Sequence, residues 1–198
     1  MRSNSFLLFA VVIFAGTLVQ ACFSGGSNTN IPPVADSKAP QKQKENEDII
    51  TSGQWRPAEA CDFLSEIGLR TRGYKDLFGD GEYTCSSDYK EIGTNTPFAN
   101  DIAYYAYGTS GVVKKLKIVL NVKAVGQRVS AHNELQRASS ALTQKAIGVE
   151  LPNTAVTSIN QGKPGRWMVG GYSIEVTREE WSTGKGYEIH FTMPSPLQ

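Results

Sequence analysis

Histidine, cysteine and carboxylate side chains could do chemistry in this chain, and the first two types are scarce. The sequence holds two histidines, His132 and His190, and three cysteines. Histidine is the commonest general base near neutral pH. His132 lies in a segment of helical periodicity, which predicts a position on a helix surface or rim. His190 alternates with Ile189 and Phe191, which predicts the outward face of a strand beside Glu188. Neither histidine is therefore expected to be catalytic.

The sequence lacks the patterns that assemble a catalytic or metal site. The motifs HExxH, CxxC, GxSxG and the P-loop do not occur. Asp80-Gly81-Glu82 lacks the regular ligand series of a calcium-binding loop, and residues 162–166 lack a following helix start that could bind phosphate. Both segments are interpreted as turns. We therefore expect no catalytic residue, no metal and no cofactor, and hence a non-enzymatic protein.

The first 22 residues predict where the chain is sent. Arg2 precedes an unbroken apolar run at 6–15, and small Ala21 precedes Cys22. A cation, a short apolar core and a small residue before the cleavage site are typical of a secretory signal peptide. The apolar run is too short to span a membrane, which takes about 20 apolar residues.

The segment Val19-Gln20-Ala21-Cys22 resembles the lipobox of bacterial lipoproteins, with Val19 and Gln20 where the usual pattern has Leu and a small residue. The resemblance implies that residues 1–21 are removed as a lipoprotein signal peptide. It also implies that the Cys22 thiol carries a diacylglycerol and that the new amine is acylated, as with palmitate. Several acyl chains would anchor the protein stably to a membrane. Phe23 stands where Asp retains enteric lipoproteins at the inner membrane, which favours the outer membrane, on either its periplasmic or its surface side.

Cys61 and Cys85 are the two cysteines that remain after Cys22. An even pair in an exported chain predicts one disulfide bond. Two free buried thiols are the alternative, and a redox centre would use the absent CxxC pattern. Closing a loop of this length stabilises a fold by roughly 3 kcal/mol.

Composition divides the remaining chain into two parts. Residues 22–54 contain one aromatic residue and many small or polar ones, which predicts a flexible tether that carries the lipid. Residues 55–198 contain all three tryptophans and all eight tyrosines, which predicts a single globular domain. The chain has 20 basic and 19 acidic side chains, and removal of Arg2 with the signal peptide balances them. A neutral chain lacks the basic footprint of a nucleic-acid-binding protein.

Apolar periodicity predicts the elements of this domain. Helices are expected from Pro57 to a stop at Gly73, at 128–147, and from Pro152 to about Asn160. Strands are expected at 83–85, 102–107, 112–122, 172–176 and 187–191. This order predicts an α+β fold: an antiparallel sheet of about five strands with two main helices on one face.

The hairpin between residues 102 and 122 decides which of its tyrosines are exposed. If Gly108 and Gly111 face each other across the turn, Tyr104 pairs with Lys115 on the outer face, and Tyr105 points toward the core. A slip of one residue would exchange the two faces. Tyrosines beside lysine stems make amphipathic binding surfaces, so we expect Tyr104 to contact a partner.

Trp181 is the second expected contact. It lies in the connection between the last two strands, where a large ring either binds a partner or folds back over the end of the sheet. Tyr104 and Trp181 are therefore the candidate partner-binding residues.

These features favour a membrane-tethered envelope lipoprotein that acts as a protein-interaction or assembly module, with another envelope protein as its partner. An inhibitor or immunity-type lipoprotein that neutralises a toxin or hydrolase is one alternative. A periplasmic domain that binds a small ligand or lipid is another. The sequence carries no feature that separates these three functions.

Overall fold

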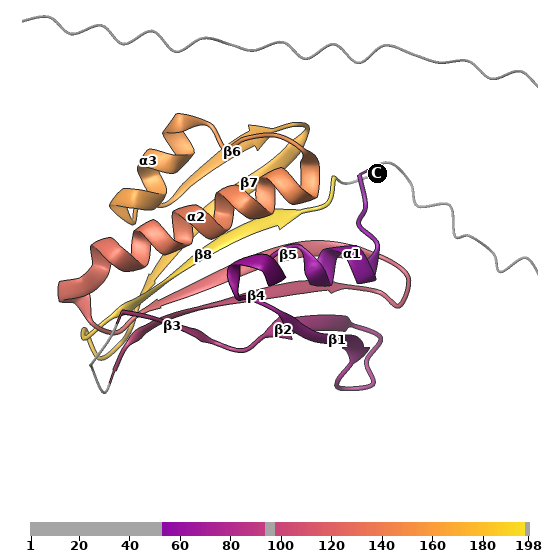
Figure 1. The fold of residues 1–198 in the computed structure, drawn as a ribbon, viewed down its shortest axis with the longest axis horizontal. Coiled ribbons are helices and arrows are strands. Elements are labelled where there is room, and N and C mark those ends of the chain that lie inside the picture. Colours follow the sequence, from indigo (N-terminus) through magenta and orange to yellow (C-terminus); the bar gives the residue numbers. More distant parts are fainter. Residues whose placement is uncertain (1–52, 94–97, 197–198) are drawn as a thin grey trace, which may run out of the picture. The chain divides into compact units, whose positions relative to one another are not determined.

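The computed structural model describes residues 53–93 and 98–196, all within one compact unit, Glu45–Gln198. The expected signal peptide, Cys22 and residues 22–52 of the expected tether lie outside this part. Figure 1 shows an antiparallel sheet with helices packed on one of its faces. The helices are α1 (Pro57–Asp62), α2 (Arg128–Ile147) and α3 (Asn153–Gln161). None of the helices in the described part is both long and apolar enough to cross a membrane.

The sheet has eight strands, and every pairing is antiparallel. The strands are β1 (Thr71–Asp76), β2 (Tyr83–Ser87), β3 (Lys90–Ile92), β4 (Asn100–Gly108), β5 (Val113–Val122), β6 (Gly165–Val169), β7 (Tyr172–Glu180) and β8 (Tyr187–Pro194). Their order is β1-β2-β4-β5-β8-β7-β6, and β3 pairs with the other end of β4. The expected α+β class and antiparallel sheet are confirmed, whereas the expected number of strands is too small.

Three strands were not expected from the sequence. In β1, neither face is fully buried, so its residues do not alternate between apolar and polar. β3 is only three residues long. β6 begins at Gly165, inside the segment that was interpreted as a turn, and its Met168 points into solvent.

Helix α2 matches its prediction at both ends. One side of the helix is fully buried against the sheet, at Ala131, Leu135, Ala138 and Leu142. Gly148 ends the helix with a φ of 70°, a left-handed conformation that glycine adopts without a steric penalty. Ala131 and Ala138 are small, which lets the helix lie close to the sheet, while Leu135 and Leu142 fill the core.

The first helix is shorter than its apolar stripe predicts. α1 stops at Asp62, and a separate 3-10 turn at Ser65–Ile67 follows it. Gly68 then adopts a φ of 86° and turns the chain toward β1. Gly73, the expected end of the helix, lies within β1 instead.

The hairpin of β4 and β5 has a different register from the expected one. Tyr104 pairs with Ile118 and Tyr105 with Lys117, so the strands are shifted by three residues. An odd shift exchanges the two faces of a strand. Tyr104 is therefore in the core with no exposed surface, and Tyr105 is on the outer face. The expectation that Tyr104 is exposed was wrong.

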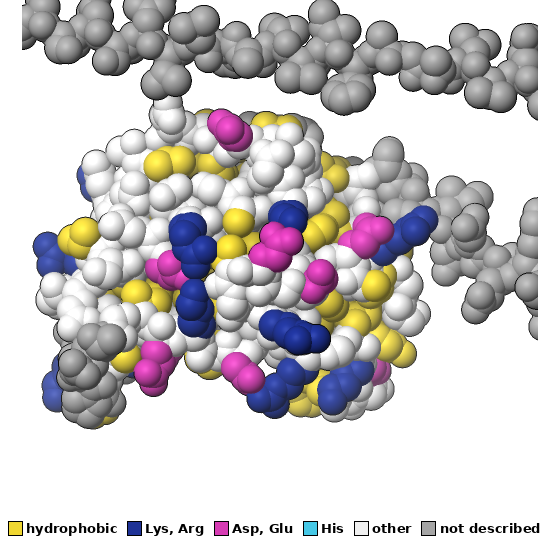
Figure 2. Space-filling model, viewed as in Figure 1, with side chains coloured by type: hydrophobic (Ala, Val, Ile, Leu, Met, Phe, Trp, Pro, Cys, Tyr) yellow, Lys and Arg dark blue, Asp and Glu magenta, His cyan; other side chains and the backbone are white. Residues whose placement is uncertain are grey.

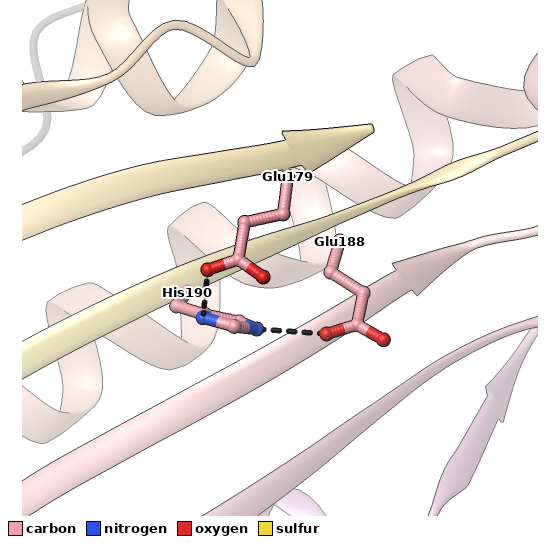
Figure 3. Close-up of side chains that lie close together, drawn as sticks. All are labelled: Glu179, Glu188 and His190. Atoms are coloured by element: carbon pink, nitrogen blue, oxygen red, sulfur yellow. Dashed lines mark hydrogen bonds and ion pairs between the residues drawn. The ribbon is translucent and has the colours of Figure 1, made fainter. Parts of the chain in front are cut away.

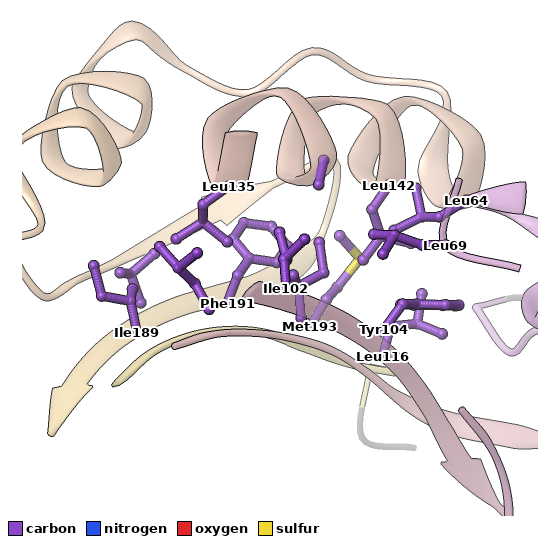
Figure 4. Packing of buried hydrophobic residues seen from close by; sticks show 14 of the residues in the cluster. Leu64, Leu69, Ile102, Tyr104, Leu116, Leu135, Leu142, Ile189, Phe191 and Met193 are labelled. Carbon is purple, nitrogen blue, oxygen red and sulfur yellow. The ribbon is translucent and has the colours of Figure 1, made fainter. Parts of the chain in front are cut away.

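The hydrophobic core lies between the helices and one face of the sheet (Figure 4). Leu135 and Leu142 of α2 project toward Phe191 and Met193 of β8, and Leu64 and Leu69 close the end near Tyr104. The other face of the sheet carries no helix of the described part, and we call it the open face. The pairings place on it alternate residues of β4, β5, β7 and β8, namely Asp101, Ala103, Tyr105, Tyr107, Lys115, Lys117, Val119, Asn121, Ser173, Glu175, Thr177, Glu179, Glu188, His190, Thr192 and Pro194.

Candidate functional site

Tyrosine and lysine side chains form two rows across one half of the open face. In the first row, Lys75, Thr84, Tyr107 and Lys115 lie side by side on β1, β2, β4 and β5. In the second row, the corresponding residues are Arg72, Ser86, Tyr105 and Lys117. We call Arg72, Lys75, Tyr105, Tyr107, Lys115 and Lys117 the tyrosine–lysine surface. The antiparallel register alone brings these side chains together.

The two tyrosines of this surface form a preorganised aromatic platform. The rings of Tyr105 and Tyr107 stack with their centroids 5.9 Å apart and 10° between their planes. The Nζ atom of Lys115 lies 4.5 Å from the centre of the Tyr107 ring, and the Tyr105 hydroxyl lies 3.0 Å from that of Tyr89. Burial raises the pKa of Tyr107, so its hydroxyl stays protonated at neutral pH. The platform therefore offers neutral donors beside cations.

Several cations of this surface have no acidic partner among the described residues. Arg72 forms an ion pair with Asp88, but Lys75, Lys115 and Lys117 form no ion pair there. A shallow hollow of about 390 Å³ adjoins the platform, between Tyr107 and Lys115 on one side and Asp80-Gly81-Glu82 on the other. The unpaired lysines can thus accept negative charge, whereas the hollow beside them carries the carboxylates of Asp80 and Glu82.

Trp181, the second expected contact, is half-buried in the turn between β7 and β8. The backbone N–H of Trp181 donates to the backbone carbonyl of Gly186, at 3.0 Å. Its ring lies against Gly186, where an added Cβ would be 2.8 Å from Cε3 of the indole. The structure does not bring Trp181 together with Tyr104, since Tyr104 is in the core. A partner contact at Trp181 stays a prediction.

Glu179, Glu188 and His190 meet on the open face of β7 and β8, and we call them the acid–imidazole cluster (Figure 3). Nε2 of His190 lies 2.9 Å from a carboxylate oxygen of Glu188, and Nδ1 lies 3.8 Å from one of Glu179. The outward position predicted for His190 beside Glu188 is confirmed. Glu179 was not expected there, because its position depends on the pairing of β7 with β8. Carboxylate oxygens and an imidazole nitrogen are atom types that can bind a divalent metal ion.

His132 lies in the interior, and its expected surface position was wrong. It is 3% exposed and bridges α3 and β8. Nδ1 donates to the carbonyl of Asn160 at 3.1 Å, since a carbonyl can only accept, and Nε2 therefore accepts from the hydroxyl of Tyr187 at 2.9 Å. The Arg178 guanidinium covers the Tyr187 ring, 3.6 Å from its centre. Burial lowers the pKa of His132, and Arg178 lowers it further. This histidine holds elements together as a neutral ring.

The predicted disulfide is present between Cys61 of α1 and Cys85 of β2. It lies on the core side of the sheet, since Cys85 pairs with Ala106 and both are buried. The bond therefore fixes α1 to the sheet and takes no part in the open face.

Comparison of the chain with protein-family models, curated proteins and solved structures finds no match. Resemblance of fold therefore contributes nothing to the assignment of function, which depends on the side chains of the open face.

Proposed function

We propose that the chain is a membrane-tethered envelope lipoprotein whose folded part binds another envelope protein through the tyrosine–lysine surface. The lipid on Cys22 would hold the protein at the membrane, and residues 22–54 would let the domain reach its partner. The observation that carries the proposal is the stacked Tyr105–Tyr107 platform flanked by cations on a sheet face without a helix.

Aromatic rings with lysines beside them are suited to protein recognition. Tyrosine supplies a large rigid contact area and a hydrogen-bonding hydroxyl, and it is enriched where interfaces bind most strongly. Both platform tyrosines are half-buried, so their rings are already held before a partner arrives. Little conformational entropy is then lost on binding.

The unpaired lysines indicate the charge of the partner. Lys75, Lys115 and Lys117 end the two rows without an ion pair among the described residues. By contrast, Figure 2 shows cationic and acidic side chains interspersed on the side where α2 lies in front of the sheet. An acidic partner surface would complement the lysines and speed association. Added salt should weaken this binding, because it screens the charges.

Crosslinking in intact membranes tests the proposal. Tagged full-length protein would be compared with Cys22→Ala, with Lys115→Glu/Lys117→Glu, and with a matched control, Lys163→Glu/Lys185→Glu. The control makes the same change in net charge at two exposed positions outside the surface. Equal melting temperatures would show that both charge variants fold.

We expect one envelope protein to be captured by the unaltered chain and by the control. The Lys115/Lys117 variant should lose it, and the Cys22→Ala form should capture less because the tether no longer places it at the membrane. Equal capture by the two charge variants, or no specific capture at all, would overturn the proposal. A captured toxin or hydrolase would make the protein an inhibitor, whereas an envelope assembly protein would make it an assembly module.

A further inference from the structure

We propose that the acid–imidazole cluster binds a divalent transition-metal ion of the Zn²⁺ class through Glu179, Glu188 and one ring nitrogen of His190. This inference is independent of the proposed function. It rests on three observations about the open face of β7 and β8: the register of the strands, the charges that it places together, and the freedom of one ligand to move.

The register brings the three side chains to one point. Glu179 of β7 lies directly opposite Glu188 of β8, and His190 follows Glu188 by two residues on the same face. One donor atom from each residue lies within 4.8 Å of the others. The ligands come from two paired strands of a sheet, so their backbone positions are already fixed.

The charges of the cluster are unbalanced in the absence of a cation. Like charges directly opposite each other on paired strands destabilise a sheet. The ion-pair partner that the described part of the chain provides for Glu179 and Glu188 is His190 in both cases. One imidazole carries at most a single positive charge, and it cannot neutralise two carboxylates. The register places Thr177, Val119 and Asn121 beside these residues, and none of them is cationic.

The side chains can rearrange to hold an ion. Bound Zn²⁺ takes nitrogen and carboxylate oxygen at about 2.0 to 2.2 Å, usually with four ligands in a tetrahedron. The two carboxylates now approach different ring nitrogens of His190 (Figure 3). The side chain of His190 is 13% exposed and that of Glu188 is 34% exposed, whereas that of Glu179 is 66% exposed. Glu179 can therefore swing to the metal without disturbing its neighbours, and water completes the coordination.

Zinc titration of the full-length protein in detergent, after removal of metals with a chelator, tests the site. Isothermal titration with Zn²⁺ would be carried out on the unaltered protein and on Glu179→Gln, Glu188→Gln and His190→Gln. Glu175→Gln is the matched control, because Glu175 is a carboxylate on the same face of β7 and is paired with Arg166. Binding of Co²⁺ would be followed by its visible absorption, which reports the ligand geometry.

We expect one Zn²⁺ per chain, and a loss of affinity of more than about tenfold in each of the three ligand variants. The Glu175→Gln control should bind as the unaltered protein does. Unchanged melting temperatures in the chelated state would show that the lost binding is not lost folding. Binding that survives His190→Gln, or binding weakened equally by Glu175→Gln, would overturn the proposal, and so would an absence of stoichiometric binding to the unaltered protein.

Discussion

The hydroxyl of Tyr104 donates a 2.7 Å hydrogen bond to the backbone carbonyl of Ala60, 44 positions earlier in the chain. This bond connects a central strand of the sheet to α1. Both residues are fully buried, and burial raises the pKa of Tyr104. The tyrosine that the sequence suggested for partner binding is thus a structural residue that holds the first helix on the sheet.

Removal of this hydroxyl should destabilise the fold. Tyr104→Phe leaves the packing intact and takes from the Ala60 carbonyl its shortest hydrogen bond, so we expect a loss of about 1 to 2 kcal/mol. The measurement is the urea midpoint at an unchanged denaturant slope. Tyr105→Phe is the control, because its hydroxyl is bonded to that of Tyr89 at the surface. A Tyr104→Phe midpoint equal to that of the control would contradict this role.

Reduction of the Cys61–Cys85 disulfide should lower the melting temperature. The bond closes a loop across a sequence separation of 24 residues, for which chain entropy suggests roughly 3 kcal/mol of stabilisation. Thermal unfolding with and without reductant measures the effect. Cys61→Ala/Cys85→Ala should melt like the reduced protein and should show no response to reductant. A double variant that melts like the oxidised protein would disprove the stabilising role.

The stability of the fold should fall as the pH drops through the ordinary range of histidine. Burial lowers the pKa of His132 in the folded state, whereas the unfolded chain has the ordinary value of about 6.5. The unfolded state then binds more protons below this value, so the free energy of unfolding decreases as pH falls. The stabilising contribution of neutral His132 is complete above about pH 6.5 and is lost on acidification toward the lowered pKa.

Chemical unfolding at a series of pH values between about 7.5 and 5.5 measures this slope. His132→Gln should reduce the slope, whatever its effect on absolute stability. His190→Gln serves as the comparison, because it removes the other histidine of the chain and should keep the contribution of His132. If His132→Gln leaves the slope unchanged, another group is responsible.

Substitution by alanine should destabilise the protein to different extents at two glycines that end helices. Gly162 ends α3 with a φ of 62° and Gly148 ends α2 with a φ of 70°, so both substitutions carry a left-handed strain of about 1 to 2 kcal/mol. An added Cβ at Gly162 would lie 2.5 Å from Cε1 of His132, whereas one at Gly148 meets no atom within 4 Å. Gly162→Ala should therefore lower the free energy of unfolding by about 1 to 3 kcal/mol more than Gly148→Ala does. Equal losses in denaturant unfolding would show that His132 moves aside freely.

Local patterns were sufficient for the long elements of the fold. Helix α2 has a buried stripe at regular spacing and a glycine at its end, and both signals lie within its own residues. The prediction for α1 was too long because the α-helix stops at Asp62 and the chain continues as a 3-10 turn at Ser65–Ile67, before Gly68 turns it toward β1. β1 lacks a buried face, so it forms a strand only because β2 lies beside it.

The candidate site depends on pairings that no single segment contains. A shift of three residues between β4 and β5 moved Tyr104 into the core and placed Tyr105 on the open face. Likewise, Glu179 and His190 lie on different strands, and only the register of β7 and β8 brings them together. Turn chemistry sets such registers, and the irregularity between Tyr107 and Gly108 was not visible in the residue types.

The place of β8 in the sheet limits the order in which the protein can fold. β8 is the last strand along the chain, yet it lies between β5 and β7. Its pairing joins Lys115 to Pro194 and Val122 to Tyr187, and such distant partners meet slowly. Until residues 187–194 have been synthesised, the chain consists of two unjoined half-sheets, and β5 and β7 each present an unpaired edge to neighbouring chains.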